Sequence, residues 1–202
     1  GSDFVTVTHC TFAHNDGSYD NLSVMHGALD ANGGGDSVII ENNVFFDNVL
    51  PLSISDNFDL DDSNTFHNPD DVSETNQRNG IFAYTGTVEN DISWGETEVA
   101  FIFQDTDWWI VASGSLSLAD GVVVKARSGG IRSALNIASD ISILIPLGAS
   151  VVFTSYYDDA RKGDTNGDGN ATGPVFDDWD GIYNDGEDKW VDWGFVLYDN
   201  GH

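Results

Sequence analysis

The stretch that decides the fold is Phe4–Asn15, FVTVTHCTFAHN, together with its counterpart Ser37–Asn48, SVIIENNVFFDN. Both copies contain a short apolar strand, then a polar pair, a phenylalanine and a closing asparagine. The segment 64–68, NTFHN, repeats the end of the same unit. Units that recur every 20 to 50 residues or so indicate a solenoid, because one unit can bury its apolar face only by stacking on its neighbours.

The repeat predicts which side chains stack on one another. Phe12, Phe45 and Phe66 occupy equivalent positions, so we expect the three rings to be buried along one axis. Asparagines recur at the matching turns, where their side chains can satisfy backbone groups. We therefore interpret these asparagines as a structural ladder.

The rest of the chain carries the same strand-and-turn pattern. Short alternating apolar runs are separated by Gly, Asn and Asp clusters, and helical periodicity is almost absent. The runs include 5–7, 38–40, 50–54, 116–118, 122–124, 141–145 and 151–153. The pattern predicts an all-β solenoid with long acidic loops.

We expect one domain over 1–202, cut from a longer chain, with two departures from the repeat. The polar segment near 68–94 is predicted to be an irregular crossing between two stretches of coils. A boundary between two small β-domains is the alternative. The second departure is a loop insertion near 158–178.

Composition narrows the function classes. The 202 residues include 34 acidic and 7 basic side chains, for a net charge of −27. Such a surface is unsuited to nucleic acid, whose affinity comes from Lys and Arg at phosphates, or to anionic lipid. It favours cations as partners. No apolar run approaches the roughly 20 residues that span a bilayer, so we expect no membrane insertion. The single Cys10 rules out an internal disulfide.

The sharpest motif is 164–170, DTNGDGN, which matches the first half of a calcium loop. Oxygen ligands at positions one, three and five, here Asp164, Asn166 and Asp168, converge on a hard cation, and Asn170 supplies a carbonyl. Val175 stands where a bidentate Glu is usual. The candidates for the missing carboxylate are Asp177 and Asp178, or Asp158 and Asp159. A solvated acidic loop with turn-forming pairs is the alternative.

Two further groups have both a binding and a structural interpretation. The acidic cluster Asp56, Asp59, Asp61 and Asp62 is either a solvated outer face or a second, weaker cation site. Aromatic residues gather late in the chain, and such rings either fill the solenoid core or form a sugar-binding surface. The candidate ligand contacts are Trp179, Tyr183 and the outward member of an adjacent pair, Trp109.

The order of several segments along the chain resembles the right-handed parallel β-helix repeat proteins of bacterial surfaces. The segments are VTVTHCTFAHNDG, VIIENNVFFDN, LSLADGVVVKA, VVFTSYYDDARKGDTNGDGNATGPVFDDWDGIY and WVDWGFVLYDNG. The resemblance implies a right-handed parallel β-helix from a secreted or cell-surface, adhesin-like protein. Together with the calcium-loop motif, the resemblance predicts a calcium-stabilised segment with a structural or glycan-binding role, whose partners are calcium and a surface polysaccharide or another protein.

A carbohydrate-active β-helix enzyme, a polysaccharide lyase or an epimerase, is the alternative. Lyases of that fold combine calcium with a Lys or Arg base. The one loose basic cluster, Lys125, Arg127 and Arg132, is distant from the calcium loop in sequence, and the histidines show no zinc spacing. We therefore assign no catalytic residue and lean toward a protein without enzymatic activity.

Overall fold

The computed structural model shows an all-β chain, with strands β1 to β20 and no helix in the part of the chain it describes. That part comprises residues 4–16, 26–31, 38–55, 57–84, 86–88, 90–103, 108–110, 114–133 and 143–200. The side chains of 108–110 and 132–133 lie outside it. Within these residues, no helix is long and apolar enough to cross a membrane.

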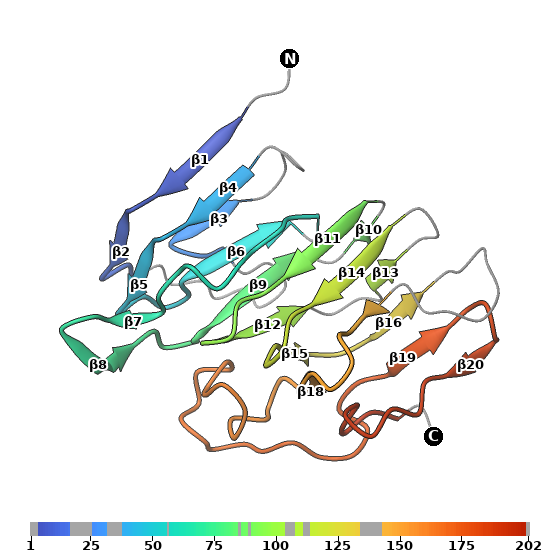
Figure 1. Ribbon diagram of the computed structural model, residues 1–202. Helices are drawn as coiled ribbons and strands as arrows, with labels where there is room; N and C mark the ends of the chain where they lie inside the picture. The colour runs from blue at the N-terminus through green and yellow to red at the C-terminus, as the bar shows by residue number, and fades with distance from the viewer. Residues whose placement is uncertain are drawn as a thin grey trace.

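The largest sheet has six parallel strands that lie side by side in chain order. They are β3 (Leu29–Ala31), β6 (Leu52–Ser55), β9 (Gly80–Tyr84), β12 (Ala100–Phe103), β15 (Val123–Ala126) and β18 (Val152–Ser155). Consecutive strands of this sheet are separated along the chain by strands of other sheets (Figure 1).

From β9 onward, the intervening strands belong to two other sheets. The five-stranded sheet contains β10 (Thr87–Val88), β13 (Trp108–Ile110), β16 (Gly130–Ser133), β19 (Gly181–Asn184) and β20 (Lys189–Trp190). The three-stranded sheet contains β11 (Asp91–Trp94), β14 (Ser115–Leu118) and β17 (Ile143–Leu144). From β9 to β17 the chain visits the six-, five- and three-stranded sheets in the same order three times. Every pairing in these sheets is parallel except β19 with β20.

The two repeat copies at the N-terminal end pair residue for residue. Strand β1 (Val5–Thr8) lies beside β4 (Val38–Glu41), and β2 (Thr11–Ala13) lies beside β5 (Val44–Phe46). Phe12 is opposite Phe45, as the repeat predicts. The ring centroids of Phe12 and Phe45 are 5.0 Å apart, and those of Phe45 and Phe66 are 5.3 Å apart, with nearly parallel planes. Phe45 and Phe66 are fully buried, whereas Phe12, the first ring of the row, is half-buried.

The asparagines form the predicted ladders. Asn15 donates to Oδ1 of Asn48 at 2.6 Å, and Asn48 donates to Oδ1 of Asn76 at 2.8 Å. A second row joins Asn43 to Asn64 at 3.1 Å. The buried amides also bond backbone carbonyls, such as that of Phe12 with Asn48 at 2.9 Å. Each ladder satisfies turn groups that the coil cannot pair within itself.

The segment near 68–94 differs from the irregular crossing that the sequence suggested. Its irregular part is an antiparallel hairpin of β7 (His67–Asn68) and β8 (Asp71–Thr75), after which Asn76 resumes the ladder. The rest of the segment contributes β9, β10 and β11 to the three sheets. The prediction was wrong because β9 has the sequence GIFAY. This continuous apolar run lacks the apolar–polar alternation of a strand that has one face exposed to solvent.

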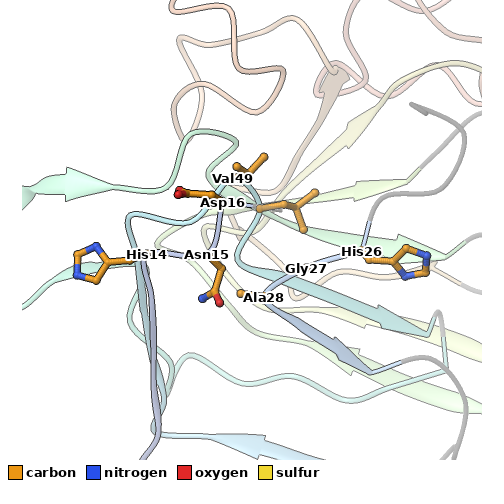
Figure 2. A pocket seen from close by; sticks show the side chains of 8 residues that line it. His14, Asn15, Asp16, His26, Gly27, Ala28 and Val49 are labelled. Atoms are coloured by element: carbon orange, nitrogen blue, oxygen red, sulfur yellow. The ribbon is translucent and has the colours of Figure 1, made fainter. Parts of the chain in front are cut away.

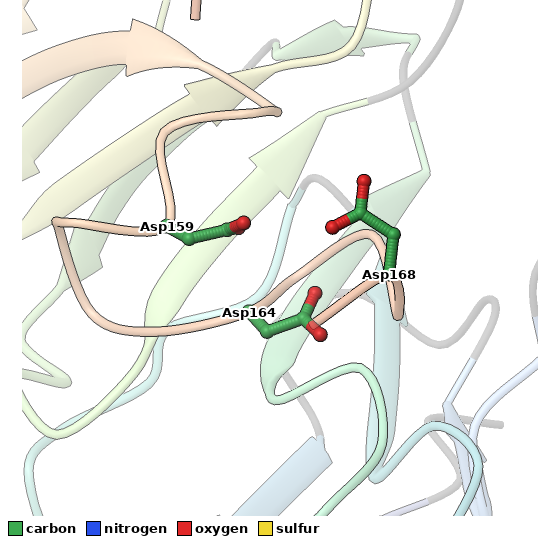
Figure 3. A group of neighbouring side chains, drawn as sticks. All are labelled: Asp159, Asp164 and Asp168. Carbon is green, nitrogen blue, oxygen red and sulfur yellow. The ribbon is translucent and has the colours of Figure 1, made fainter. Parts of the chain in front are cut away.

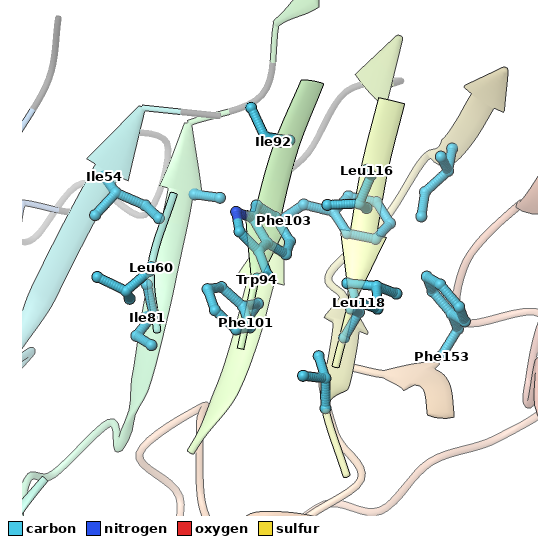
Figure 4. Packing of buried hydrophobic residues seen from close by; sticks show 14 of the residues in the cluster. Ile54, Leu60, Ile81, Ile92, Trp94, Phe101, Phe103, Leu116, Leu118 and Phe153 are labelled. Carbon is cyan, nitrogen blue, oxygen red and sulfur yellow. The ribbon is translucent and has the colours of Figure 1, made fainter. Parts of the chain in front are cut away.

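The core lies between the sheets and is built from the inward-facing side chains of the strands, which alternate with outward-facing ones (Figure 4). Trp94 stacks on Phe101 with ring centroids 4.3 Å apart. The outer face of the six-stranded sheet is also apolar, with a small buried cluster of Leu50, Phe82, Ile102 and Tyr156. A strand that is buried on both faces must be covered on its outer side, and here the acidic segment after β18 (residues 158–178) covers it.

Candidate metal centre

The acidic segment after β18 is fastened to the outer face of the six-stranded sheet by a buried lysine. Lys125 is fully buried, and its Nζ donates to the carbonyl of Gly163 at 2.9 Å and to Oγ1 of Thr165 at 3.1 Å. Thr165 in turn donates to the carbonyl of Tyr156 at 2.9 Å. The carbonyl of Asp164 accepts from the backbone of Asn79 at 2.9 Å, which ties the loop to the start of β9. These bonds hold the calcium-type motif against the sheet.

Three carboxylates converge in this segment: those of Asp159, Asp164 and Asp168 (Figure 3). One oxygen from each lies within 4.8 Å of the others. Both oxygens of Asp159 are shielded from solvent and have no hydrogen-bond partner. Burial and the nearby charge of Asp164 raise the pKa of Asp159. The arrangement concentrates negative charge on three half-buried side chains.

The loop backbone is shaped around two of these carboxylates. Asp164 accepts from the backbone nitrogens of Gly167 at 2.6 Å and Gly169 at 2.7 Å. Asp168 accepts from Ala171 at 2.8 Å and from the hydroxyl and backbone of Thr172. The hydrogen bond from Thr172, chiefly, lowers the pKa of Asp168. The ionised form of Asp168, which is the form that binds cations, is therefore favoured.

The other predicted ligands lie in different settings. The side-chain oxygen of Asn166 accepts from the backbone of Asp168 at 3.0 Å, so this residue is beside the group. Asn170 is exposed and has a φ of +78°. Asp177 is exposed, and Asp178 accepts from Ser155 at 2.5 Å and from Val175 at 2.9 Å. The structure brings neither Asp177 nor Asp178 into the three-carboxylate group.

Of the four aspartates suggested for the missing carboxylate, Asp159 is the one that lies beside Asp164 and Asp168. Its neighbour Asp158 is buried and bonds Thr154 at 2.7 Å and Arg161 at 2.7 Å, so its charge is already compensated. Which of the two adjacent carboxylates turns toward the loop depends on how the chain leaves β18. The sequence carries no signal for that choice.

The aromatic candidates do not form one surface in the described structure. Trp179 is buried, donates from Nε1 to the carbonyl of Leu197 at 2.8 Å, and packs edge-on against Phe103. Its ring is buried in the core and has no exposed face on which a sugar could stack, contrary to the prediction that Trp179 contacts a ligand. Tyr183 is half-buried and bonds Asp188 at 2.5 Å. The side chain of Trp109 lies outside the described part.

The second acidic cluster caps backbone groups of the neighbouring coil. Asp59 accepts from the backbone of Ser93 at 2.7 Å, and Asp62 accepts from the backbone of Thr97 at 2.8 Å. Asp61 accepts from Ser63 at 3.1 Å, within its own turn. Asp56 lies outside the described residues. The described members therefore support the structural interpretation of this cluster.

Two pockets include polar or charged side chains in their lining. One, of about 330 Å³, lies near the N-terminal strands and includes His14 and His26 (Figure 2). These imidazoles point away from each other, and each has its own carboxylate, Asp47 for His14 and Asp30 for His26. They are therefore not arranged as joint ligands of one metal.

The other pocket lies beside the candidate metal centre. It has a volume of about 190 Å³ and is lined by Arg78, Arg127, Tyr156, Tyr157, Asn166, Asp168 and Thr172. The fold thus brings two arginines, remote in sequence from the loop and from each other, to the edge of the three-carboxylate group. Sequence analysis missed this juxtaposition, because only the stacking of β9 and β15 within one sheet creates it.

Comparison with known proteins adds no relative: no family model, no curated protein and no solved structure matches the chain.

Proposed function

We propose that the chain is a right-handed parallel β-helix segment of a bacterial cell-surface, adhesin-like protein, stabilised by calcium bound at Asp159, Asp164 and Asp168. The repeated visit to three sheets supports stacked coils. Right-handedness follows from the strong preference of connections between parallel strands of one sheet. The phenylalanine row and the asparagine ladders support a rigid, stacked element whose role is structural and adhesive.

The observation that carries the calcium proposal is the environment of Asp159. Its two carboxylate oxygens are shielded from solvent, have no hydrogen-bond partner and face two other carboxylates. Burial and repulsion from Asp164 outweigh the opposing charge of Lys125 and raise the pKa of Asp159, so its ionised form carries a penalty. Shielded carboxylates of this kind are normally paired or coordinate a metal. A divalent cation between the three carboxylates removes this penalty and their mutual repulsion together.

The donor chemistry fits calcium. All nearby donors are oxygens, the kind of ligand that Ca²⁺ takes, and calcium tolerates irregular geometry with six to eight ligands, backbone carbonyls and waters included. Asn166 and Asn170 stand at positions that such loops use for coordination. Without a bidentate Glu, the proposed affinity is in the range of about 10⁻⁴–10⁻³ M, typical of extracellular modules. A site of that strength fills outside the cell, which is the basis for a surface location.

Thermal unfolding with and without calcium tests the proposal. At 10 mM calcium the proposed affinity gives a stabilisation of about 1–3 kcal/mol, or about 3–10 °C in Tm. Asp159→Asn should abolish the calcium response and raise the Tm of the calcium-free protein, because it removes a repelled charge. Asp177→Asn makes the same charge change in an exposed residue outside the group and should keep the response. Equal calcium responses in both variants would overturn the assignment.

A further inference from the structure

The pocket beside the candidate metal centre has the composition of an anion site in an otherwise acidic molecule. The chain has 7 basic residues against 34 acidic ones, yet Arg78 and Arg127 both line this small pocket. We propose that the pocket binds the carboxylate of an acidic sugar in a calcium-dependent manner. This inference rests on the proposed function, because it requires the cation at Asp159, Asp164 and Asp168.

The two arginines come from different coils and reach the same place. Arg78 precedes β9, and its side chain lies so close to Gly167 that a Cβ there would be 3.1 Å from the guanidinium Nε. Arg127 directly follows β15. Both charges act on the phenol of Tyr156, whose pKa burial nevertheless raises to about 12. A guanidinium group offers paired donors that match the two oxygens of a carboxylate.

Charge makes the site dependent on the cation. When the metal centre is empty of calcium, the three carboxylates are balanced by the two guanidinium groups and the nearby ammonium of Lys125, so an anion finds no net attraction. One divalent ion then leaves a net positive region on a protein of charge −27. An acidic ligand is therefore attracted to this place and repelled elsewhere. By linkage, the ligand should tighten calcium binding by the same factor as calcium tightens the ligand.

The remaining lining suits a sugar better than a bare anion. Tyr157 presents a half-buried ring that packs edge-on against Tyr156, with ring centroids 5.5 Å apart. Asn166, Asp168 and the exposed Thr172 provide polar groups for hydroxyls. A volume of about 190 Å³ is below the size of drug-like pockets, which suits the binding of a single sugar unit.

Protein-observed NMR titration with glucuronate, glucose and acetate, each with and without 10 mM calcium, tests the inference. We expect glucuronate with calcium to shift the resonances of Tyr157 and Thr172, with an affinity at least 5-fold above that of acetate and no saturable effect of glucose. Removal of calcium should weaken glucuronate binding at least 10-fold. Equal binding of acetate and glucuronate, or binding that ignores calcium, overturns the inference.

Matched variants separate this pocket from the metal centre. Arg127→Gln should weaken glucuronate at least 10-fold while the calcium-dependent rise in Tm persists, and Arg78→Gln provides a second test should the first variant unfold. Lys189→Gln makes the same charge change at an exposed residue paired with Glu187 and should leave glucuronate binding unchanged. If the unmodified protein responds normally to calcium but does not bind glucuronate, the inference is wrong and the proposed function stands. If the unmodified protein shows no calcium response, the proposed function is wrong, and the inference that rests on it fails as well.

Discussion

The ammonium group of Lys125 donates a hydrogen bond to the hydroxyl of Thr165 over 3.1 Å, across 40 residues of sequence. Lys125 points away from the core, between the inward Val124 and Ala126, into the space that the acidic loop covers. One buried side chain thus joins the six-stranded sheet to the loop that carries the candidate metal centre.

This contact predicts an unusual alkaline response. Burial lowers the pKa of Lys125 to about 8, although the charges of Asp159 and Asp158 oppose the shift. Between about pH 8 and 10.4 the unfolded chain then binds more protons at this group than the folded chain, so its contribution to stability grows as the pH rises. The gain is on the order of 3 kcal/mol across that window. Urea denaturation of the calcium-free protein should show this slope in the unmodified chain and lose it in Lys125→Met. If the exposed Lys189→Met changes the slope as much, the assignment to Lys125 fails.

Glu96 predicts the opposite dependence at lower pH. Its side chain is fully buried, and burial, with smaller effects from the carboxylates of Asp62 and Glu98, raises its pKa to about 8. The folded chain therefore binds more protons than the unfolded chain above about pH 4.3, so stability from this group falls as the pH rises toward 8.

Glu96→Gln retains the side-chain oxygen that accepts from the backbone of Glu98 at 2.6 Å but removes the titration. The variant should match the unmodified protein near pH 4 and be more stable at pH 9 by on the order of 5 kcal/mol, because each pKa unit between the unfolded and folded values is worth about 1.4 kcal/mol. Paired urea curves at the two pH values measure this difference. An unchanged difference between pH 4 and 9 would show that Glu96 does not titrate in this range.

The phenylalanine row predicts a gradient of stability effects. Phe45 has a ring on each side and is fully buried, so Phe45→Ala should cost about 3–5 kcal/mol, the usual scale for this truncation in a core. Phe12 has one stacking partner in the described structure and is half-buried, so Phe12→Ala should cost clearly less. Equal losses for the two variants in urea denaturation would contradict the stacking order.

The start of the fold was predictable from the sequence because its first two strand pairs share one pattern of apolar, phenylalanine and asparagine positions. The alignment of Phe4–Asn15 with Ser37–Asn48 is the register in which β1 pairs with β4 and β2 with β5. The coil over 80–94 was not predictable in this way. Its strand GIFAY is buried on both faces, which removes the alternation that marks a strand with one wet face.

The candidate metal centre was predictable only in part. A local motif places Asp164 and Asp168 in one loop, since the ligand spacing is contained in the sequence itself. The participation of Asp159 and the approach of Arg78 depend on how the loop folds back over β9 and β15. Trp179 was wrongly predicted to contact a ligand, because the sequence around an aromatic residue does not show whether its ring faces the core or the solvent.

The most direct test of the calcium proposal is a crystal structure of the protein grown in millimolar calcium, with the anomalous signal used to identify the ion. The account predicts one ion between Asp159, Asp164 and Asp168, with carboxylate oxygens at about 2.3–2.6 Å. A site that stays empty under these conditions, with Asp159 paired to another protein group, would contradict it, as would an ion held only by other residues.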